Sequence, residues 1–242
     1  RAPRHRGRGA QHFSGMTDSG SAFAFDVTLP AGIVQVDAVW DRASQPWATL
    51  VLAHGAGAGM THPWLAGFAD AAAALGLSTM RFTFPYLQAG RRMPGPAPHA
   101  IAAWRAAVQV ASTDAGTAII AGGKSYGGRM ASMAAAEGAI SPAALVYLGY
   151  PLHPPGKPEK PRVEHLPDVT APQLFVSGTR DAFVDPHEQL EDAVASCQDA
   201  TLQWVEGGGH SFEVAGNKRD AAVVGAELAP SVVAELRRIL SR

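Results

Sequence analysis

The sequence contains one cysteine, no long apolar run and no strong excess of charge of either sign. Cys197 cannot form a disulfide within the chain, which is typical of a reducing compartment, and we predict a cytoplasmic protein. We interpret its thiol as a small buried apolar group rather than as a nucleophile. No apolar run approaches the roughly 18 residues that a membrane-spanning helix needs, so we predict no membrane segment.

Basic residues are concentrated at the N-terminal end. The first fifteen residues hold four arginines and no acid, and the remainder has 21 acidic residues against 16 basic ones. We predict no nucleic-acid partner, because the body of the chain has no basic field. Residues 1–15 lack the apolar centre of a secretion signal, and we predict a disordered extension, native or artificial, before a natural start at Met16. Residues 16–242 are predicted to form a single domain.

No two histidines stand four residues apart with a carboxylate at zinc-like spacing. We therefore predict no metal site, and nothing in the sequence demands another cofactor.

Short apolar runs alternate with helical patterns from about residue 48 onward, which is typical of strand-helix-strand units around a parallel sheet. Because the runs are almost continuously apolar, we expect strands that helices cover on both faces. The expected strands span residues 49–53, 77–82, 117–121, 144–148, 173–176 and 201–205. Upstream, residues 22–29 and 33–40 flank a Pro-Ala-Gly turn and predict an antiparallel pair.

Three longer stretches predict helices. Apolar residues recur at helical spacing over residues 64–75, with Thr61 as the expected N-cap. A second stripe covers residues 101–111, and a third helical stretch covers residues 220–240, where Pro230 predicts a break or a kink. The predicted fold class is therefore α/β, with a mostly parallel twisted sheet between two layers of helices.

One serine lies at the junction of an expected strand and an alanine-rich helix. Ser125 is flanked by Gly123 and Gly127 in a G-x-S-x-G pattern. The pattern alone is weak, but a nucleophilic serine in a strained strand-to-helix turn needs glycines two residues to either side. A serine hydroxyl is a poor nucleophile near neutral pH, so it also needs a base and a group that orients the base.

Candidates for both partners follow in the required order. Asp181 comes directly after the 173–176 strand, and His210 comes after the next one. The sequence therefore predicts a catalytic triad of Ser125, Asp181 and His210. Asp185 is the rival acid, but together with Pro186 it is typical of a helix start.

Acyl transfer also needs backbone N–H donors for the developing oxyanion. We expect Tyr126, the residue after the serine, to supply the first donor. The second should come from the glycine-rich segment at residues 54–59, either from Ala56 or from Gly57.

Five segments resemble the α/β-hydrolase superfamily: HGAGAG at 54–59, FPY at 84–86, GGKSYGGR at 122–129, GYPLHPPG at 149–156 and GTRDAF at 178–183. The chain is similar to the dienelactone-hydrolase-like proteins, and most resembles the branch containing testis-expressed protein 30 and the third subunit of the non-specific-lethal complex. The resemblance spans roughly residues 48–212 and implies an α/β-hydrolase fold with a minimal cap. Dienelactone hydrolase uses a cysteine nucleophile, so its substrate is not carried over. Some members of the branch are subunits of larger assemblies, which allows a protein partner here.

The predicted function is that of a serine hydrolase, resembling carboxylic ester hydrolases, that acts on a small-molecule acyl substrate through an acyl-enzyme. The alternative is a non-catalytic interaction module on the same scaffold. Nucleotide binding is disfavoured, although Gly123-Lys-Ser125 resembles the end of a phosphate-binding loop. The first glycine of that motif would fall at Ala118, and the next residues are expected in a strand.

Substrate-binding residues are less evident from the sequence. Arg91 and Arg92, in a Pro/Gly-rich connection, are candidates for binding an anionic group, although a solvated charge pair is the more ordinary interpretation. Tyr150 and His153 are candidate pocket residues because they follow the 144–148 strand. Since little sequence is available for a lid, we expect a shallow, open pocket that favours small acyl groups.

Overall fold

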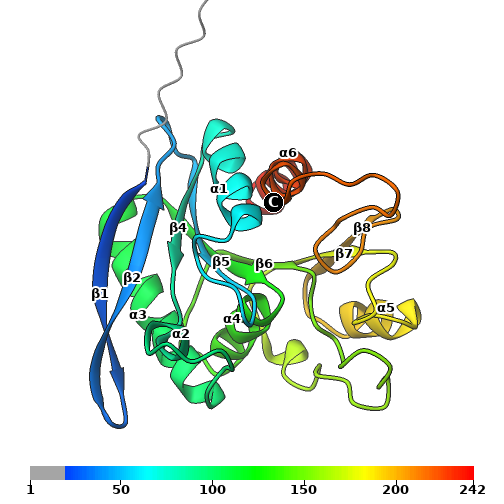
Figure 1. The fold of residues 1–242 in the computed structure, drawn as a ribbon, viewed down its shortest axis with the longest axis horizontal. Helices are drawn as coiled ribbons and strands as arrows, with labels where there is room; N and C mark the ends of the chain where they lie inside the picture. The colour runs from blue at the N-terminus through cyan, green and yellow to red at the C-terminus, as the bar shows by residue number, and fades with distance from the viewer. Residues whose placement is uncertain (1–19) are drawn as a thin grey trace, which may run out of the picture.

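The computed structural model describes residues 20–242, and the extension predicted to be disordered lies outside them. Eight strands form one sheet in the order β1-β2-β4-β3-β5-β6-β7-β8, flanked by helices (Figure 1). The strands are β1 (Ser21–Leu29), β2 (Gly32–Asp41), β3 (Ala48–Ala53), β4 (Leu77–Phe82), β5 (Ala118–Lys124), β6 (Ala144–Leu148), β7 (Gln173–Gly178) and β8 (Ala200–Val205). The helices are α1 (Pro63–Ala74), α2 (Pro85–Gln88), α3 (Ala97–Ala115), α4 (Tyr126–Ala136), α5 (His187–Ala195) and α6 (Ala221–Leu240), and Leu166–Asp168 form a 3-10 turn.

The sheet is parallel from β4 through β3 and β5 to β8. The predicted hairpin is also present, because β1 and β2 pair antiparallel and β2 pairs antiparallel with β4. Each predicted strand overlaps an observed one, so the predicted α/β class with a mostly parallel sheet is confirmed.

Each face of the sheet carries its own apolar core. Helices α1 and α6 cover one face, and α3, α4 and α5 cover the other (Figure 1). The central strands β3, β4 and β6 are buried along their whole length, which explains why their sequences are nearly continuous in apolar residues. Among the described helices, none combines the length and the apolar character that crossing a bilayer requires.

Helices α1 and α6 pack unusually closely. A Cβ atom added at Gly225 in α6 would lie 2.1 Å from the Trp64 carbonyl oxygen in α1, and one added at Gly67 would lie 2.1 Å from the Ala222 carbonyl oxygen. Two backbones can approach this closely only where the intervening residues have no side chain. The glycines therefore bring α6 down onto α1 and the sheet.

Three helices differ from the sequence expectation. The N-cap of α1 is His62 and not the predicted Thr61, because the His62 ring accepts the Trp64 backbone N–H at 3.2 Å. Helix α6 runs without a break through Pro230, so the predicted break at that residue is wrong. Its buried apolar stripe, including Leu228, Val232 and Leu236, packs on the sheet, and this burial outweighs the one backbone hydrogen bond that proline removes. Helix α3 begins at Ala97, earlier than the apolar stripe suggests, because Pro98 is tolerated in a first helical turn.

Parallel strands end at a common edge, and this edge positions the candidate site. The connections that follow β3, β5, β7 and β8 all leave the sheet there. These connections carry the glycine-rich segment, Ser125, Asp181 and His210, in that order along the chain.

Candidate active site

Ser125 occupies the sharp turn between β5 and α4. Its backbone φ is 49°, in the left-handed region that side-chain-bearing residues rarely adopt. An added Cβ would lie 2.5 Å from the Ala53 carbonyl oxygen at Gly123, and 2.7 Å from the same atom at Gly127. Because only backbone surrounds them, both positions require glycine, and the strained turn presents the serine at the sheet edge.

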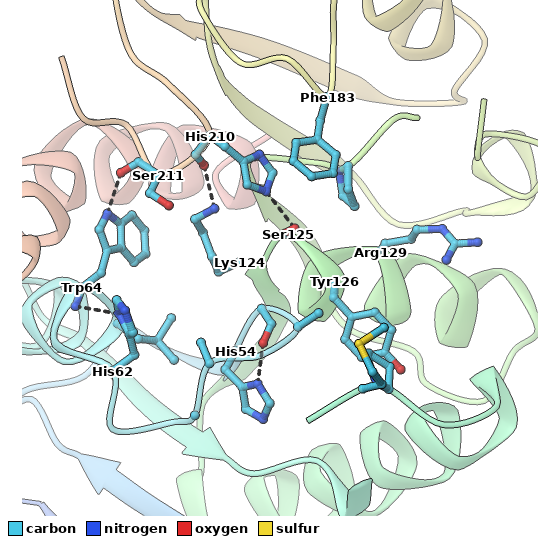
Figure 2. A pocket seen from close by; sticks show the side chains of 18 of the residues that line it. His54, His62, Trp64, Lys124, Ser125, Tyr126, Arg129, Phe183, His210 and Ser211 are labelled. Atoms are coloured by element: carbon cyan, nitrogen blue, oxygen red, sulfur yellow. Dashed lines mark hydrogen bonds between the residues drawn. The ribbon is translucent and has the colours of Figure 1, made fainter. Parts of the chain in front are cut away.

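Asp181 and His210 meet the serine from two neighbouring strand ends. The His210 Nε2 atom lies 2.9 Å from Ser125 Oγ, and its Nδ1 atom lies 2.7 Å from Asp181 Oδ2; Figure 2 shows the first contact. The carboxylate is buried, so the ring N–H at Nδ1 donates to it and Nε2 is left to accept the hydroxyl proton. The structure thus brings the three predicted residues together in one hydrogen-bonded chain.

The second oxygen of the Asp181 carboxylate is also occupied. Its Oδ1 atom accepts the Phe183 backbone N–H at 2.9 Å. The Phe183 ring stacks on the His210 ring, with 4.1 Å between centroids, which limits rotation of the imidazole. The rival Asp185 is exposed and lies outside this arrangement.

Two side chains from distant elements hold the loop that carries His210. The Lys124 ammonium, beside the serine, donates to the His210 carbonyl oxygen at 2.6 Å, and the Trp64 indole N–H donates to the Ser211 carbonyl oxygen at 3.0 Å (Figure 2). Burial lowers the pKa of Lys124 to about 8, and the nearby Asp181 charge opposes this shift. Lys124 therefore acts as a tether to the histidine loop.

Backbone amides line the space beside the serine. Tyr126 begins α4, and its N–H has no acceptor within residues 20–242, so it is free to bind an oxyanion. Ala56 is exposed and lines the same pocket. Gly57 does not line the pocket; its backbone lies beside the Tyr86 phenol and opposes the rise in the Tyr86 pKa that burial causes. Of the two predicted second donors, Ala56 is therefore the one that lines the pocket containing Ser125.

His54 fixes the start of the glycine-rich segment. Its Nδ1 atom lies 2.8 Å from the Gly55 carbonyl oxygen, and its Nε2 atom accepts the Phe84 backbone N–H at 3.1 Å. This pattern requires a neutral ring, in agreement with burial, which lowers the pKa of His54 to about 4. The buried histidine thereby ties the segment after β3 to the segment after β4.

A pocket of about 500 Å³ opens over Ser125 and His210. Trp64 and Leu65 line one part of it, and Figure 2 places Trp64 and Arg129 on opposite sides of Ser125. Met93, Pro94 and a second arginine, Arg162, also line the pocket. Most of the wall is apolar, with a few polar groups near the serine, as in many small-molecule sites.

The four predicted substrate-binding residues lie elsewhere. Arg91 and Arg92 are exposed and do not line the pocket, although the next two residues of their loop do. Tyr150 is buried, and its hydroxyl donates to the carbonyl oxygen of Arg162, which lines the pocket, at 2.7 Å. His153 is fully buried and contacts the Pro154 carbonyl oxygen through Nδ1. Neither Tyr150 nor His153 is among the lining residues of the pocket.

Sequence reasoning missed Arg129, Arg162 and Phe183 as pocket residues. Arg129 lies one helical turn after the serine, and that four-residue spacing was a usable signal. Arg162 lies in an irregular loop, and no periodicity marks it. Trp64 was interpreted as core, and it is indeed buried, but its indole also reaches the histidine loop.

Comparison with known proteins gives a family and a set of structural neighbours. The family described as Alpha/beta hydrolase domain matches residues 46–232. An α/β serine hydrolase without a lid from Xanthomonas campestris superposes with a TM-score of 0.69 at 20% identity, covering 90% of this chain and 94% of that one. Dienelactone hydrolase from Anabaena variabilis gives a TM-score of 0.66 at 21% identity, covering 88% and 96%. Est1E from Butyrivibrio proteoclasticus gives 0.66 at 15% identity, covering 90% and 99%. The predicted α/β-hydrolase fold is confirmed.

Proposed function

Because the chain belongs to the Alpha/beta hydrolase domain family, we propose that it is a serine hydrolase acting on an ester or a related acyl bond of a small substrate. The observation that carries this proposal is the pair of contacts, 2.9 Å and 2.7 Å, that join Ser125 to His210 and His210 to Asp181. A nucleophile, a base and an orienting carboxylate at hydrogen-bonding distance are what acyl transfer to serine requires.

In the proposed reaction, His210 Nε2 takes the hydroxyl proton as Ser125 Oγ attacks the acyl carbonyl carbon. The resulting oxyanion accepts hydrogen bonds from the Tyr126 and Ala56 backbone N–H groups. His210 then gives the proton to the leaving alcohol, and the acyl group stays on Ser125. Water, deprotonated by the same imidazole, releases the acid and restores the serine, while Asp181 stabilises the imidazolium throughout.

The decisive variant is Ser125→Ala. We expect it to lower turnover of p-nitrophenyl butyrate by about three orders of magnitude or more, because removing the nucleophile leaves only binding and oxyanion stabilisation. The measurement is release of p-nitrophenol, with circular dichroism to verify that the variant is folded. Turnover that survives in the folded variant contradicts the assignment.

Labelling with a fluorophosphonate distinguishes the serine hydrolase from the second candidate function, a non-catalytic interaction module. A fluorophosphonate reacts only with a serine whose hydroxyl is activated by a base, so mass spectrometry should find one adduct on Ser125. A module on a hydrolase scaffold gives no adduct. The intact hydrogen-bonded chain favours the enzyme, since a scaffold has no physical reason to keep a base aligned on a hydroxyl.

Three finer assignments also belong to the proposal. The five segments quoted above support placement in the branch that contains testis-expressed protein 30, where a protein partner is also a prediction. The two apolar cores pack on opposite faces of one sheet, which supports a single domain over residues 16–242. The lone cysteine supports a cytoplasmic location.

A further inference from the structure

Two arginine side chains line the pocket that contains the candidate nucleophile. Arg129 lies on α4 one turn after Ser125, and its backbone N–H donates to the Ser125 carbonyl oxygen. Arg162 belongs to the connection between β6 and β7 and lines the same pocket. Both are partly buried, and neither belongs to the predicted triad or to the predicted oxyanion donors.

Neither guanidinium has an anionic partner in the part of the chain that the structure describes. No ion pair and no side-chain hydrogen bond of Arg129 or Arg162 occurs there, and the Arg129 Nε atom is buried without an acceptor. Glu164 is the nearest acid in sequence, but it is exposed and forms no ion pair with either arginine. A buried N–H donor without a partner is unfavourable, and a bound anion would satisfy it.

Hydrogen bonds hold together the two elements that carry Arg129 and Arg162. Burial and the Arg129 charge both lower the pKa of Arg162, so the two groups repel. The Tyr150 hydroxyl binds the Arg162 carbonyl oxygen, and Ser132 on α4 contacts His165 of the same connection at 2.7 Å. These bonds fix the loop that carries one arginine against the helix that carries the other. Two guanidinium groups that line one pocket and have no acidic partner can together offer paired N–H donors to an oxyanion.

Building on the hydrolase function proposed above, we infer that Arg129 and Arg162 form a subsite for an oxyanion group on the substrate, so that the preferred substrates are acyl compounds carrying a carboxylate or a phosphate at the end remote from the scissile bond. Guanidinium groups bind both oxyanions through paired N–H donors. This site replaces Arg91 and Arg92 as the cationic part of the pocket.

The geometry also bounds the length of the substrate. The Arg129 backbone N–H donates to the Ser125 carbonyl oxygen at 3.1 Å, so the arginine begins one turn from the nucleophile. Its side chain then extends away from Ser125, past Tyr126 and Phe183 (Figure 2). An anion bound there is separated from the reacting carbonyl carbon by a short methylene chain, and the largely apolar pocket lining, which includes Phe183, can contact that chain.

The test compares two activated esters with the same six-carbon acyl chain: the mono-p-nitrophenyl ester of adipic acid, which ends in a carboxylate, and p-nitrophenyl hexanoate, which does not. For the full-length protein we expect kcat/KM to favour the anionic ester by about tenfold to a hundredfold. In Arg129→Gln combined with Arg162→Gln this ratio should fall to about one or below, because the paired donors are gone. Arg129→Lys keeps the positive charge but loses the paired N–H donors of the guanidinium, so it should give an intermediate ratio.

Two further variants act as matched controls for charge. Arg105→Gln, on the exposed face of α3, should leave the ratio at its original value, and so should Arg91→Gln combined with Arg92→Gln. A ratio that stays high when Arg129 and Arg162 are both replaced, or that falls only when Arg91 and Arg92 are replaced, overturns the inference. Circular dichroism shows whether each variant is folded.

A binding measurement keeps the subsite separate from the hydrolase proposal. In Ser125→Ala, adipate or butyl phosphate should raise the melting temperature, and the additional loss of both arginines should remove the effect. The ligand that stabilises more strongly distinguishes a carboxylate from a phosphate. If no fluorophosphonate adduct forms, the hydrolase function alone is refuted. If neither anion raises the melting temperature, the proposed subsite is refuted.

Discussion

At the scale of single residues, the proposed triad depends on groups that hold His210 and not only on the three residues proposed to react. Its ring donates to Asp181 and stacks on Phe183, and its backbone carbonyl accepts the Lys124 ammonium. A histidine fixed at its ring and at its main chain keeps one tautomer and one orientation. That preorganisation is what distinguishes a catalytic base from a surface histidine.

Asp181 and Asp185 offer a direct test of this arrangement. We expect Asp181→Asn to lower kcat by about two to four orders of magnitude, because an amide favours the wrong tautomer of His210. Asp185→Asn is the matched control and should retain kcat within about twofold, since its side chain is exposed and remote from the imidazole. Steady-state kinetics with p-nitrophenyl butyrate provide the measurement. Should Asp185→Asn carry the loss instead, the acid is misassigned.

His54 predicts how stability depends on pH. Its folded pKa of about 4 lies below the value of about 6.5 for an unfolded chain, so the neutral ring stabilises the fold fully above pH 6.5 and less as the pH falls toward 4. Between pH 7 and pH 4.5 this amounts to about 2 to 3 kcal/mol. His54→Gln should therefore lose less free energy of unfolding over that interval than the original protein, as measured by urea denaturation. Equal losses in the two proteins rule out this role.

At the scale of elements, the contact between α1 and α6 predicts that a side chain at Gly225 destabilises the protein, although helix propensity alone favours one. Gly225→Ala would gain up to about 1 kcal/mol if propensity decided. The added methyl would instead lie 2.1 Å from the Trp64 carbonyl oxygen, so we expect destabilisation by about 1 to 3 kcal/mol as α6 is forced away from α1. Val223→Ala, at an exposed position of the same helix, should be nearly neutral in the same urea titration. A stabilised Gly225→Ala variant would show that the two helices can separate at little cost.

The sequence predicted elements well where a local pattern decides the structure. Continuous apolar runs located the strands, and the Gly-x-Ser-x-Gly pattern located the turn with φ of 49°. Of the two outcomes predicted at Pro230, the break is wrong, because burial of the α6 stripe overrides a local signal, and no pattern marked Arg162, which reaches the pocket from an irregular loop. Arg129 was accessible in principle, because it lies in the first turn of the helix that follows Ser125. Tertiary packing, rather than local preference, determined what was missed.

At the scale of the whole molecule, little chain is available to close the pocket. Between β6 and β7, where the chain runs from residue 149 to residue 172, regular structure is limited to the 3-10 turn Leu166–Asp168. The pocket of about 500 Å³ is therefore bounded by loops at the sheet edge and by residues of α1 and α4, and not by an inserted helical layer.

This openness predicts that long acyl chains bring no advantage. Across p-nitrophenyl esters from two to sixteen carbons, kcat/KM should gain nothing beyond about eight carbons, because the far end of a longer chain leaves the open pocket and buries no further apolar surface. Rates measured well below the solubility limit of each ester provide the comparison. A steady rise toward the longest chains is incompatible with a site of this size.

The position of β8 at the end of the strand order has a consequence for the making of the protein. Ser125 precedes His210 by 85 residues in the chain, and the segment that bears the imidazole follows β8, which lies at the end of the sheet beside β7. A nascent chain that stops short of that strand therefore has no imidazole to place beside the serine. Under the proposed function, the chain gains reactivity toward acyl compounds only in the final stage of its synthesis.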